Sequence, residues 1–134
     1  MNNDFIDPDF VPGFVFFLEP VINYKSLQIT YSELETTLIK EKNKLLDIFE
    51  EIKKVEIPEE FSALFEDEIS TGKLGIDTIT AAIDLVINSK AEPDSLESAL
   101  SMAKRGYSLV KNALELSMKN SEILTSSIEE IIPY

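Results

Sequence analysis

The sequence predicts an all-α fold: an antiparallel four-helix bundle-like domain with two long helices, two short helices and an irregular aromatic N-terminal arm. Apolar residues recur in alternating steps of three and four almost throughout the chain after residue 24, whereas no segment alternates with the period of a strand. Proline, glycine and polar residues separate the periodic segments. At 134 residues we expect one domain, with the arm at 1–20 and the helical bundle at 21–134.

The first long helix is predicted from about Pro20 to just before Pro58, which cannot continue a helix. Its seam is Tyr24, Leu27, Tyr31, Leu34, Leu38, Leu45, Ile48, Ile52 and Val55. A later start is the alternative, because Ser32 and Glu35 have the spacing of a capping box. We prefer the earlier start, since it keeps the first two residues of the seam in register.

Two short helices are predicted next, separated by Gly72 and Gly75, which favour a stop and a turn. The first follows Pro58 and has one apolar face, formed by Phe61, Leu64, Phe65 and Ile69. The second runs from about Ile76 to Asn88, and its inward residues are Ile76, Ile79, Ile83 and Val86. Its end precedes the polar tract 89–94.

The last helix is predicted to be the longest, from an N-cap at Asp94, with Glu97 as its capping partner, to Pro133. Its seam contains Leu96, Leu100, Ala103, Tyr107, Val110, Leu114, Ser117, Ser121, Leu124, Ile128 and Ile131. Gly106 costs roughly 1 kcal/mol inside a helix relative to alanine. We therefore expect it either to allow close approach of another backbone or to mark a bend.

The residue types exclude most catalytic sites. The chain has neither histidine nor cysteine, so a Ser-His-Asp triad, a Cys-His pair and a histidine-containing di-iron site cannot be formed. Carboxylate pairs for magnesium are poorly placed, because Glu56 and Glu59 straddle Pro58, and no second pair faces Asp47 and Glu50. We predict no enzymatic activity, no catalytic or metal-binding residues and no cofactor.

The net charge of −13 argues against binding nucleic acid or anionic membranes, both of which attract clustered lysine and arginine. The first basic residue is Lys25, and the apolar run from Phe14 to Leu18 is too short for an export signal or a membrane span. We expect a soluble, cytoplasmic protein.

The arm is the first candidate for partner binding. Five of the eight phenylalanines lie in it: Phe5, Phe10, Phe14, Phe16 and Phe17. A buried aromatic ring contributes roughly 1.5–3 kcal/mol, so these rings are expected to be covered. Either they fold back on the chain's own helices, or they dock on another protein or a second copy.

An acidic stretch is the second candidate, with nine acidic residues and two lysines in 47–68, a net charge of −7. Its members are Asp47, Glu50, Glu51, Glu56, Glu59, Glu60, Glu66, Asp67 and Glu68. They form either a solvated helix face or a docking surface for a basic partner.

Polar residues occupy three seam positions, Glu41, Ser117 and Ser121. They mark either a partly wet end of the bundle or a polar layer that fixes helix register, with Lys44 or Lys111 as the partner of Glu41.

The leading functional hypothesis is a non-enzymatic protein-interaction module, an adaptor or chaperone-like factor that contacts another polypeptide through the arm and an apolar helix stripe. The alternative is an acidic inhibitor, similar in kind to an immunity protein, that neutralises a basic toxin or nucleic-acid-binding protein. A carboxylate-bound magnesium hydrolase is the least favoured hypothesis.

Overall fold

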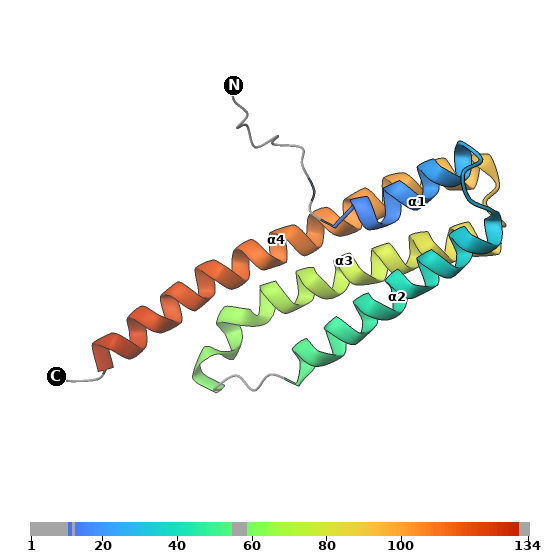
Figure 1. Ribbon diagram of the computed structural model, residues 1–134. Coiled ribbons are helices and arrows are strands. Elements are labelled where there is room, and N and C mark those ends of the chain that lie inside the picture. The colour runs from blue at the N-terminus through green and yellow to red at the C-terminus, as the bar shows by residue number, and fades with distance from the viewer. Residues whose placement is uncertain (1–10, 12, 55–58, 132–134) are drawn as a thin grey trace, which may run out of the picture.

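The computed structural model describes Val11, residues 13–54 and residues 59–131. The described chain is all-α and forms a bundle, as predicted, without any strand in these residues (Figure 1). Its helices are α1 (Val15–Lys25), α2 (Tyr31–Lys53), α3 (Ser62–Asn88) and α4 (Pro93–Ile131), with a 3-10 turn at Glu59–Phe61 before α3. None of the described helices combines the length and apolar character that crossing a membrane requires.

The four helices differ greatly in length, and this sets the shape of the bundle. α3 and α4 form a long antiparallel pair, α2 packs on α3, and α1 packs on α2 and α4 (Figure 1). At 1.5 Å per residue, α1 spans about 16 Å and α4 about 58 Å. Four helices therefore surround the core at one end of the molecule, and three continue beyond the beginning of α1.

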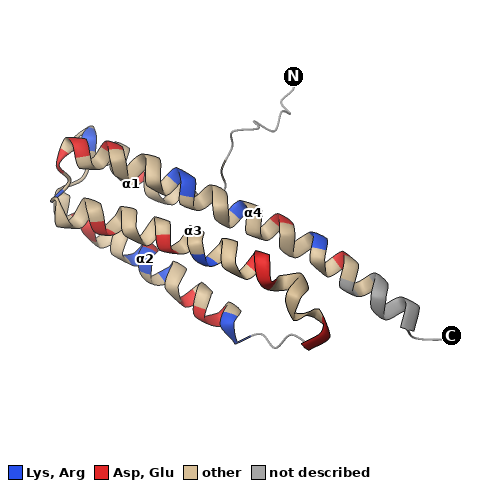
Figure 2. Cartoon of the chain, turned by 180° about the vertical axis from the view of Figure 1, so that it is seen from behind, with Lys and Arg blue, Asp and Glu red and all other residues tan. Residues whose placement is uncertain are grey.

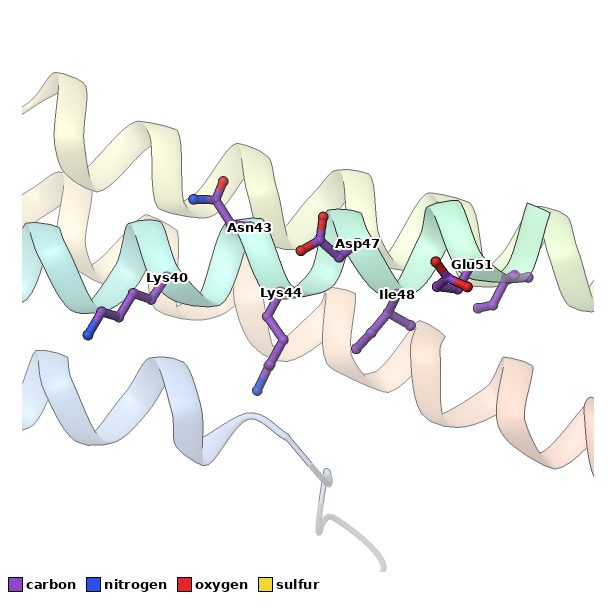
Figure 3. A pocket seen from close by; sticks show the side chains of 7 residues that line it. Lys40, Asn43, Lys44, Asp47, Ile48 and Glu51 are labelled. Carbon is purple, nitrogen blue, oxygen red and sulfur yellow. The ribbon is translucent and has the colours of Figure 1, made fainter. Parts of the chain in front are cut away.

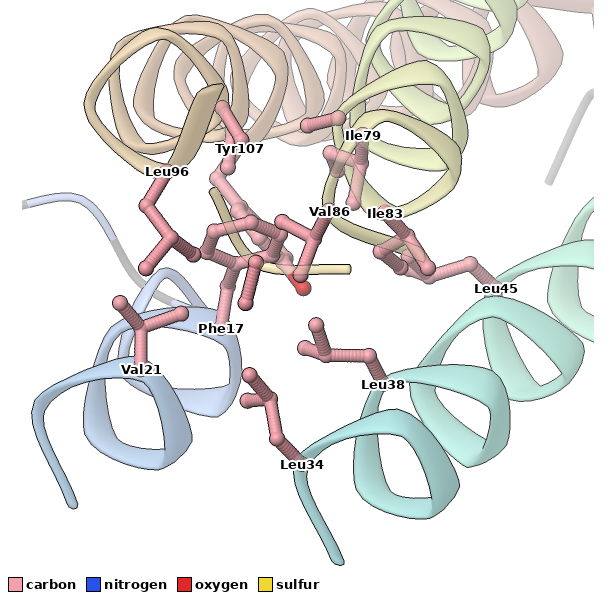
Figure 4. Close-up of a cluster of buried hydrophobic side chains, with 14 of the residues drawn as sticks. Phe17, Val21, Leu34, Leu38, Leu45, Ile79, Ile83, Val86, Leu96 and Tyr107 are labelled. Atoms are coloured by element: carbon pink, nitrogen blue, oxygen red, sulfur yellow. The ribbon is translucent and has the colours of Figure 1, made fainter. Parts of the chain in front are cut away.

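The core lies mainly in the four-helix end (Figure 4). Phe17 and Val21 enter it from α1, and their side chains have no exposed surface. The other helices contribute large apolar side chains, which are Leu34, Leu38, Ile79, Ile83, Val86 and Leu96. This packing makes α1 an integral part of the bundle.

The predicted helix from Pro20 to Pro58 is wrong at residues 26–30, where the chain turns and separates α1 from α2. Leu27, which belongs to the predicted seam, has a φ of 65° and is 90% exposed. The capping box lies at Thr30, whose hydroxyl accepts from the Glu33 N–H at 3.1 Å while the Glu33 carboxylate accepts from the Thr30 N–H at 3.0 Å. The cap predicted at Ser32 is therefore two residues late.

The predicted irregular arm at 1–20 is also corrected, because α1 begins within it, at Val15. Pro20 lies inside α1 rather than in the first turn of a long helix. The earlier part of the arm, with Phe5 and Phe10, lies outside the described residues.

The two predicted short helices are one continuous helix, α3, so the bundle has three long helices and one short helix. The glycines serve packing instead of a turn. A Cβ added to Gly75 would lie 2.7 Å from the Gly106 carbonyl oxygen, and one added to Gly106 would lie 2.8 Å from the Gly75 oxygen. Gly106 thus allows the close backbone approach that was one of its two predicted roles.

The N-cap position of α4 is Glu92, two residues before the predicted N-cap at Asp94. Pro93 is the first helical residue, a position where its missing N–H costs nothing. The Glu92 carboxylate accepts from the N–H groups of Asp94 and Ser95 at 2.9 and 3.2 Å. These hydrogen bonds, that of Asp94 first, lower the pKa of Glu92.

Candidate functional site

An apolar groove opens where three helices continue beyond the beginning of α1, and we call it the three-helix groove. Its volume is about 430 Å³. Its lining comes from α2, α3 and α4, namely Leu45, Ile48, Phe49, Ile52, Glu68, Ile69, Gly72, Ile76, Val110, Ala113, Leu114 and Ser117. Only Glu68 among these residues carries a charge.

The groove has a buried floor and an exposed apolar rim. Leu45, Ile76 and Ala113 are buried and form the floor. Ile48 and Leu114, on the two walls, are 46% and 59% exposed. Large apolar side chains that remain this accessible beside one another are typical of a surface that another molecule covers.

A polar cluster, formed by buried Glu41 and Tyr107 and half-exposed Lys44, lies next to the groove at the end nearest α1. The Tyr107 hydroxyl donates to the Glu41 carboxylate, and Lys44 Nζ lies 2.9 Å from the other carboxylate oxygen. Burial, followed by the hydrogen bond to Glu41 and the charge of Glu41, raises the pKa of Tyr107. Glu41 is thus part of a polar layer inside the bundle, with Lys44 as a lysine partner.

The same cluster anchors the beginning of α1. Lys44 Nζ lies 4.1 Å from the centroid of the Phe16 ring, and the ring centroids of Phe14 and Tyr107 are 6.3 Å apart. Val110, one helical turn beyond Tyr107, already lines the groove. The groove therefore begins where α1 begins, between the same two helices, α2 and α4, on which α1 packs.

A second, shallower depression of about 690 Å³ lies on the outer surface of α2. Figure 3 shows its side chains along that helix, with Lys44 and Ile48 pointing toward the side of α1. Its lining residues are Lys40, Asn43, Lys44, Asp47, Ile48, Glu51 and Ile52. It shares Ile48 and Ile52 with the three-helix groove, so both hollows flank one wall.

The predicted acidic residues gather around the same half of the molecule (Figure 2). Seven of the nine are exposed: Asp47, Glu50, Glu51, Glu59, Glu60, Glu66 and Asp67. Glu68 is half-buried in the groove lining, and Glu56 lies outside the described residues.

The predicted aromatic contacts divide into different environments. Phe17 is fully buried in the core of its own chain, which contradicts its assignment to partner binding. Phe14 is half-buried against Tyr107, and Phe16 is 53% exposed beneath Lys44. Phe17 is therefore buried in its own chain, whereas Phe14 and Phe16 lie against Tyr107 and Lys44 of the polar cluster.

Within the described part of the chain, no three carboxylates lie close enough together to hold a metal ion.

Comparison with protein-family models, with curated proteins and with solved structures finds no match to this chain.

Sequence reasoning found the apolar seams and expected an exposed apolar stripe, but it did not place that stripe in one half of the molecule. The groove residues Phe49, Gly72 and Ala113 were also missed, because they lie beside the seam positions. α1 does not cover this part of α2 and α4, because it begins only at Val15. Asn120 was missed as well: it is buried, and its Nδ2 donates to the Leu64 carbonyl at 2.8 Å.

Proposed function

We propose that this chain is a non-enzymatic protein-interaction module that binds a helix of another polypeptide in the three-helix groove. The observation that carries the proposal is the groove itself, with exposed Ile48, Ile52 and Leu114 above a buried apolar floor. An amphipathic helix that places its apolar face in such a groove uses a common mode of recognition.

Helix packing supports this choice of ligand. The groove lies between α2 and α4, the two helices on which α1 packs, so a helix placed there would continue the line of α1. Its walls extend from Leu45 to Ile52 on α2 and from Val110 to Ser117 on α4, about 10 Å each. A ligand helix would contact them over about two turns, through residues spaced three and four apart.

The test is affinity capture with three forms of the full chain, followed by mass spectrometry. The groove variant carries Ile48→Asn and Leu114→Asn, which keep the net charge. The control carries Ile22→Asn and Leu74→Asn, at exposed apolar residues that do not line the groove. We expect the groove variant to lose proteins that the wild type and the control retain. Identical captured sets for all three forms would contradict the proposal.

A second candidate is favoured by the exposed acidic residues: an inhibitor that neutralises a basic toxin or nucleic-acid-binding protein through charge alone. Reversal to lysine at Glu59, Glu60, Glu66, Asp67 and Glu68 should then weaken capture and flatten its dependence on salt. The groove variant should have no effect under this model. Capture that responds to neither salt nor charge reversal excludes it.

A further inference from the structure

We infer that the ligand of the three-helix groove is an amphipathic helix whose apolar face is flanked by lysine or arginine. This inference rests on the proposed function and names the chemistry of the partner. The groove supplies the apolar contact, and the acidic residues around it supply the selection for positive charge.

The charge around the groove is negative, as it is over the chain as a whole. The segments that form and border it, residues 45–54, 59–76 and 107–123, contain ten acidic residues and five lysines, a net charge of −5. Glu68 lies in the groove, and Asp47 lies next to Ile48 on the outer side of the α2 wall. A basic flank on either side of an apolar helix face would meet these carboxylates.

Three lysines near the groove are paired with glutamates of α2. Lys53 pairs with Glu50 at 3.1 Å, and Lys54 pairs with Glu51 at 3.2 Å. Lys44 pairs with the buried Glu41. Among the described residues, no ion pair includes Asp47, Glu66 or Glu68. Glu68 accepts a long hydrogen bond from Asn120 Nδ2, at 3.5 Å, so none of the three carboxylates is offset by a described lysine or arginine.

The same charges disfavour the two occupants that the chain itself could supply. The segment at residues 1–10 contains Asp4, Asp7 and Asp9 and neither lysine nor arginine. A second copy would bring a net charge of −13 to a surface of the same sign. Like charges in contact oppose binding, so a basic helix of a different protein is the complementary ligand.

The test uses three labelled helical peptides of about 16 residues, roughly four turns, with one common apolar face and flanks of lysine, glutamine or glutamate. Fluorescence anisotropy measures their binding to the full chain at low and high salt. We expect the lysine peptide to bind about tenfold more tightly than the glutamine peptide at low salt, and the difference to shrink as salt screens it. The glutamate peptide should bind most weakly.

Matched variants assign the preference to the groove. Asp47→Asn with Glu68→Gln should reduce the preference for the lysine peptide several-fold, whereas Glu19→Gln with Asp77→Asn, which removes two charges elsewhere, should leave it unchanged. Equal affinities for the lysine and glutamine peptides would overturn the inference and leave the proposed function standing. Binding that the groove variant Ile48→Asn with Leu114→Asn does not weaken, or no binding of any peptide, would overturn both.

Two further measurements decide between occupants. Phe5→Ser with Phe10→Ser in the full chain should leave peptide affinity unchanged, and a several-fold increase would show that the N-terminal segment fills the groove. Sedimentation velocity should give a monomer, whereas a dimer that Leu114→Asn dissociates would show that a second copy fills it. Either of these contrary results overturns the inference.

Discussion

Tyr107 on α4 donates a hydrogen bond to the carboxylate of Glu41 on α2, and both side chains are buried. Lys44 pairs with the second carboxylate oxygen and also lies over the Phe16 ring of α1. The cluster therefore connects three helices at the level where α1 begins. It forms the boundary between the four-helix core and the three-helix groove.

Removing the Tyr107 hydroxyl should destabilise the fold. In Tyr107→Phe one oxygen of the buried Glu41 carboxylate loses its donor, and an unsatisfied buried polar group costs about 1–3 kcal/mol. Urea denaturation measures this loss as a lower free energy of unfolding. Tyr24→Phe is the control, because the Tyr24 hydroxyl has no hydrogen bond to another described residue; an equal loss in both variants would contradict the role of the Glu41 contact.

The same tyrosine predicts a decline of stability at high pH. Burial, then the hydrogen bond to Glu41 and its charge, raise the pKa of Tyr107 above its ordinary value of about 10. The folded state therefore holds the phenolic proton more tightly than the unfolded state. Its contribution to stability is complete below about pH 10 and declines as the pH rises further, because the unfolded chain then releases that proton.

Urea denaturation at a series of pH values from neutrality to above pH 10 measures this decline. Tyr107→Phe should lose less free energy of unfolding above about pH 10 than the wild type. A smaller decline should remain, since burial and the charge of Glu35 also raise the pKa of Tyr31. Parallel curves for wild type and Tyr107→Phe would refute the assignment.

Local sequence signals predicted the helices well but not where they turn or what covers them. The seam register included Leu27, yet a backbone of positive φ takes that residue out of the helix. Conversely, Gly72 and Gly75 look like a stop, and only the opposing backbone at Gly106 explains why α3 continues. The position of a partner helix is a tertiary property that periodicity does not contain.

The candidate site was predictable in composition but not in form. The seams identified Ile48 and Leu114 as apolar, and the acidic stretch identified Asp47 and Glu68. Whether an apolar seam is covered depends on the lengths of its neighbours. α1 does not cover this part of the seam, because it begins only at Val15, and the apolar periodicity does not indicate where that helix begins.

The capping box at Thr30 should hold the beginning of α2. Thr30→Ala removes the oxygen that accepts from the Glu33 N–H and should lower the free energy of unfolding by about 0.5–2 kcal/mol. Ser32→Ala is the control, since Ser32 is exposed inside the helix and alanine is the better helix former there. Thermal or urea denaturation compares the two variants. A greater loss of stability for Ser32→Ala would show that Thr30 does not cap α2.

Two adjacent phenylalanines should differ sharply in their contribution to stability. Phe17 is fully buried, so Phe17→Ala should cost about 3–5 kcal/mol through lost burial and the cavity it leaves. Phe16 is half exposed, and Phe16→Ala should cost about 1 kcal/mol, including its contact with Lys44. Comparable losses in urea denaturation would mean that α1 does not pack as described.

The crossing of α3 and α4 should tolerate a methyl group at Gly72 but not at Gly75. A Cβ at Gly75 would lie 2.7 Å from a backbone oxygen and 3.0 Å from the backbone nitrogen of Val110, so the helices would have to separate. Overpacking of this kind costs about 1–3 kcal/mol, more than the roughly 1 kcal/mol that alanine gains over glycine in a helix.

Gly72→Ala is the matched control, because its Cβ would lie 3.5 Å from the Ala113 side chain, an ordinary contact. It should stabilise α3 by up to about 1 kcal/mol. Urea denaturation of both variants therefore gives opposite signs if the two helices meet backbone to backbone at Gly75 and Gly106. Stabilisation by both substitutions would show instead that the helices lie farther apart at this crossing.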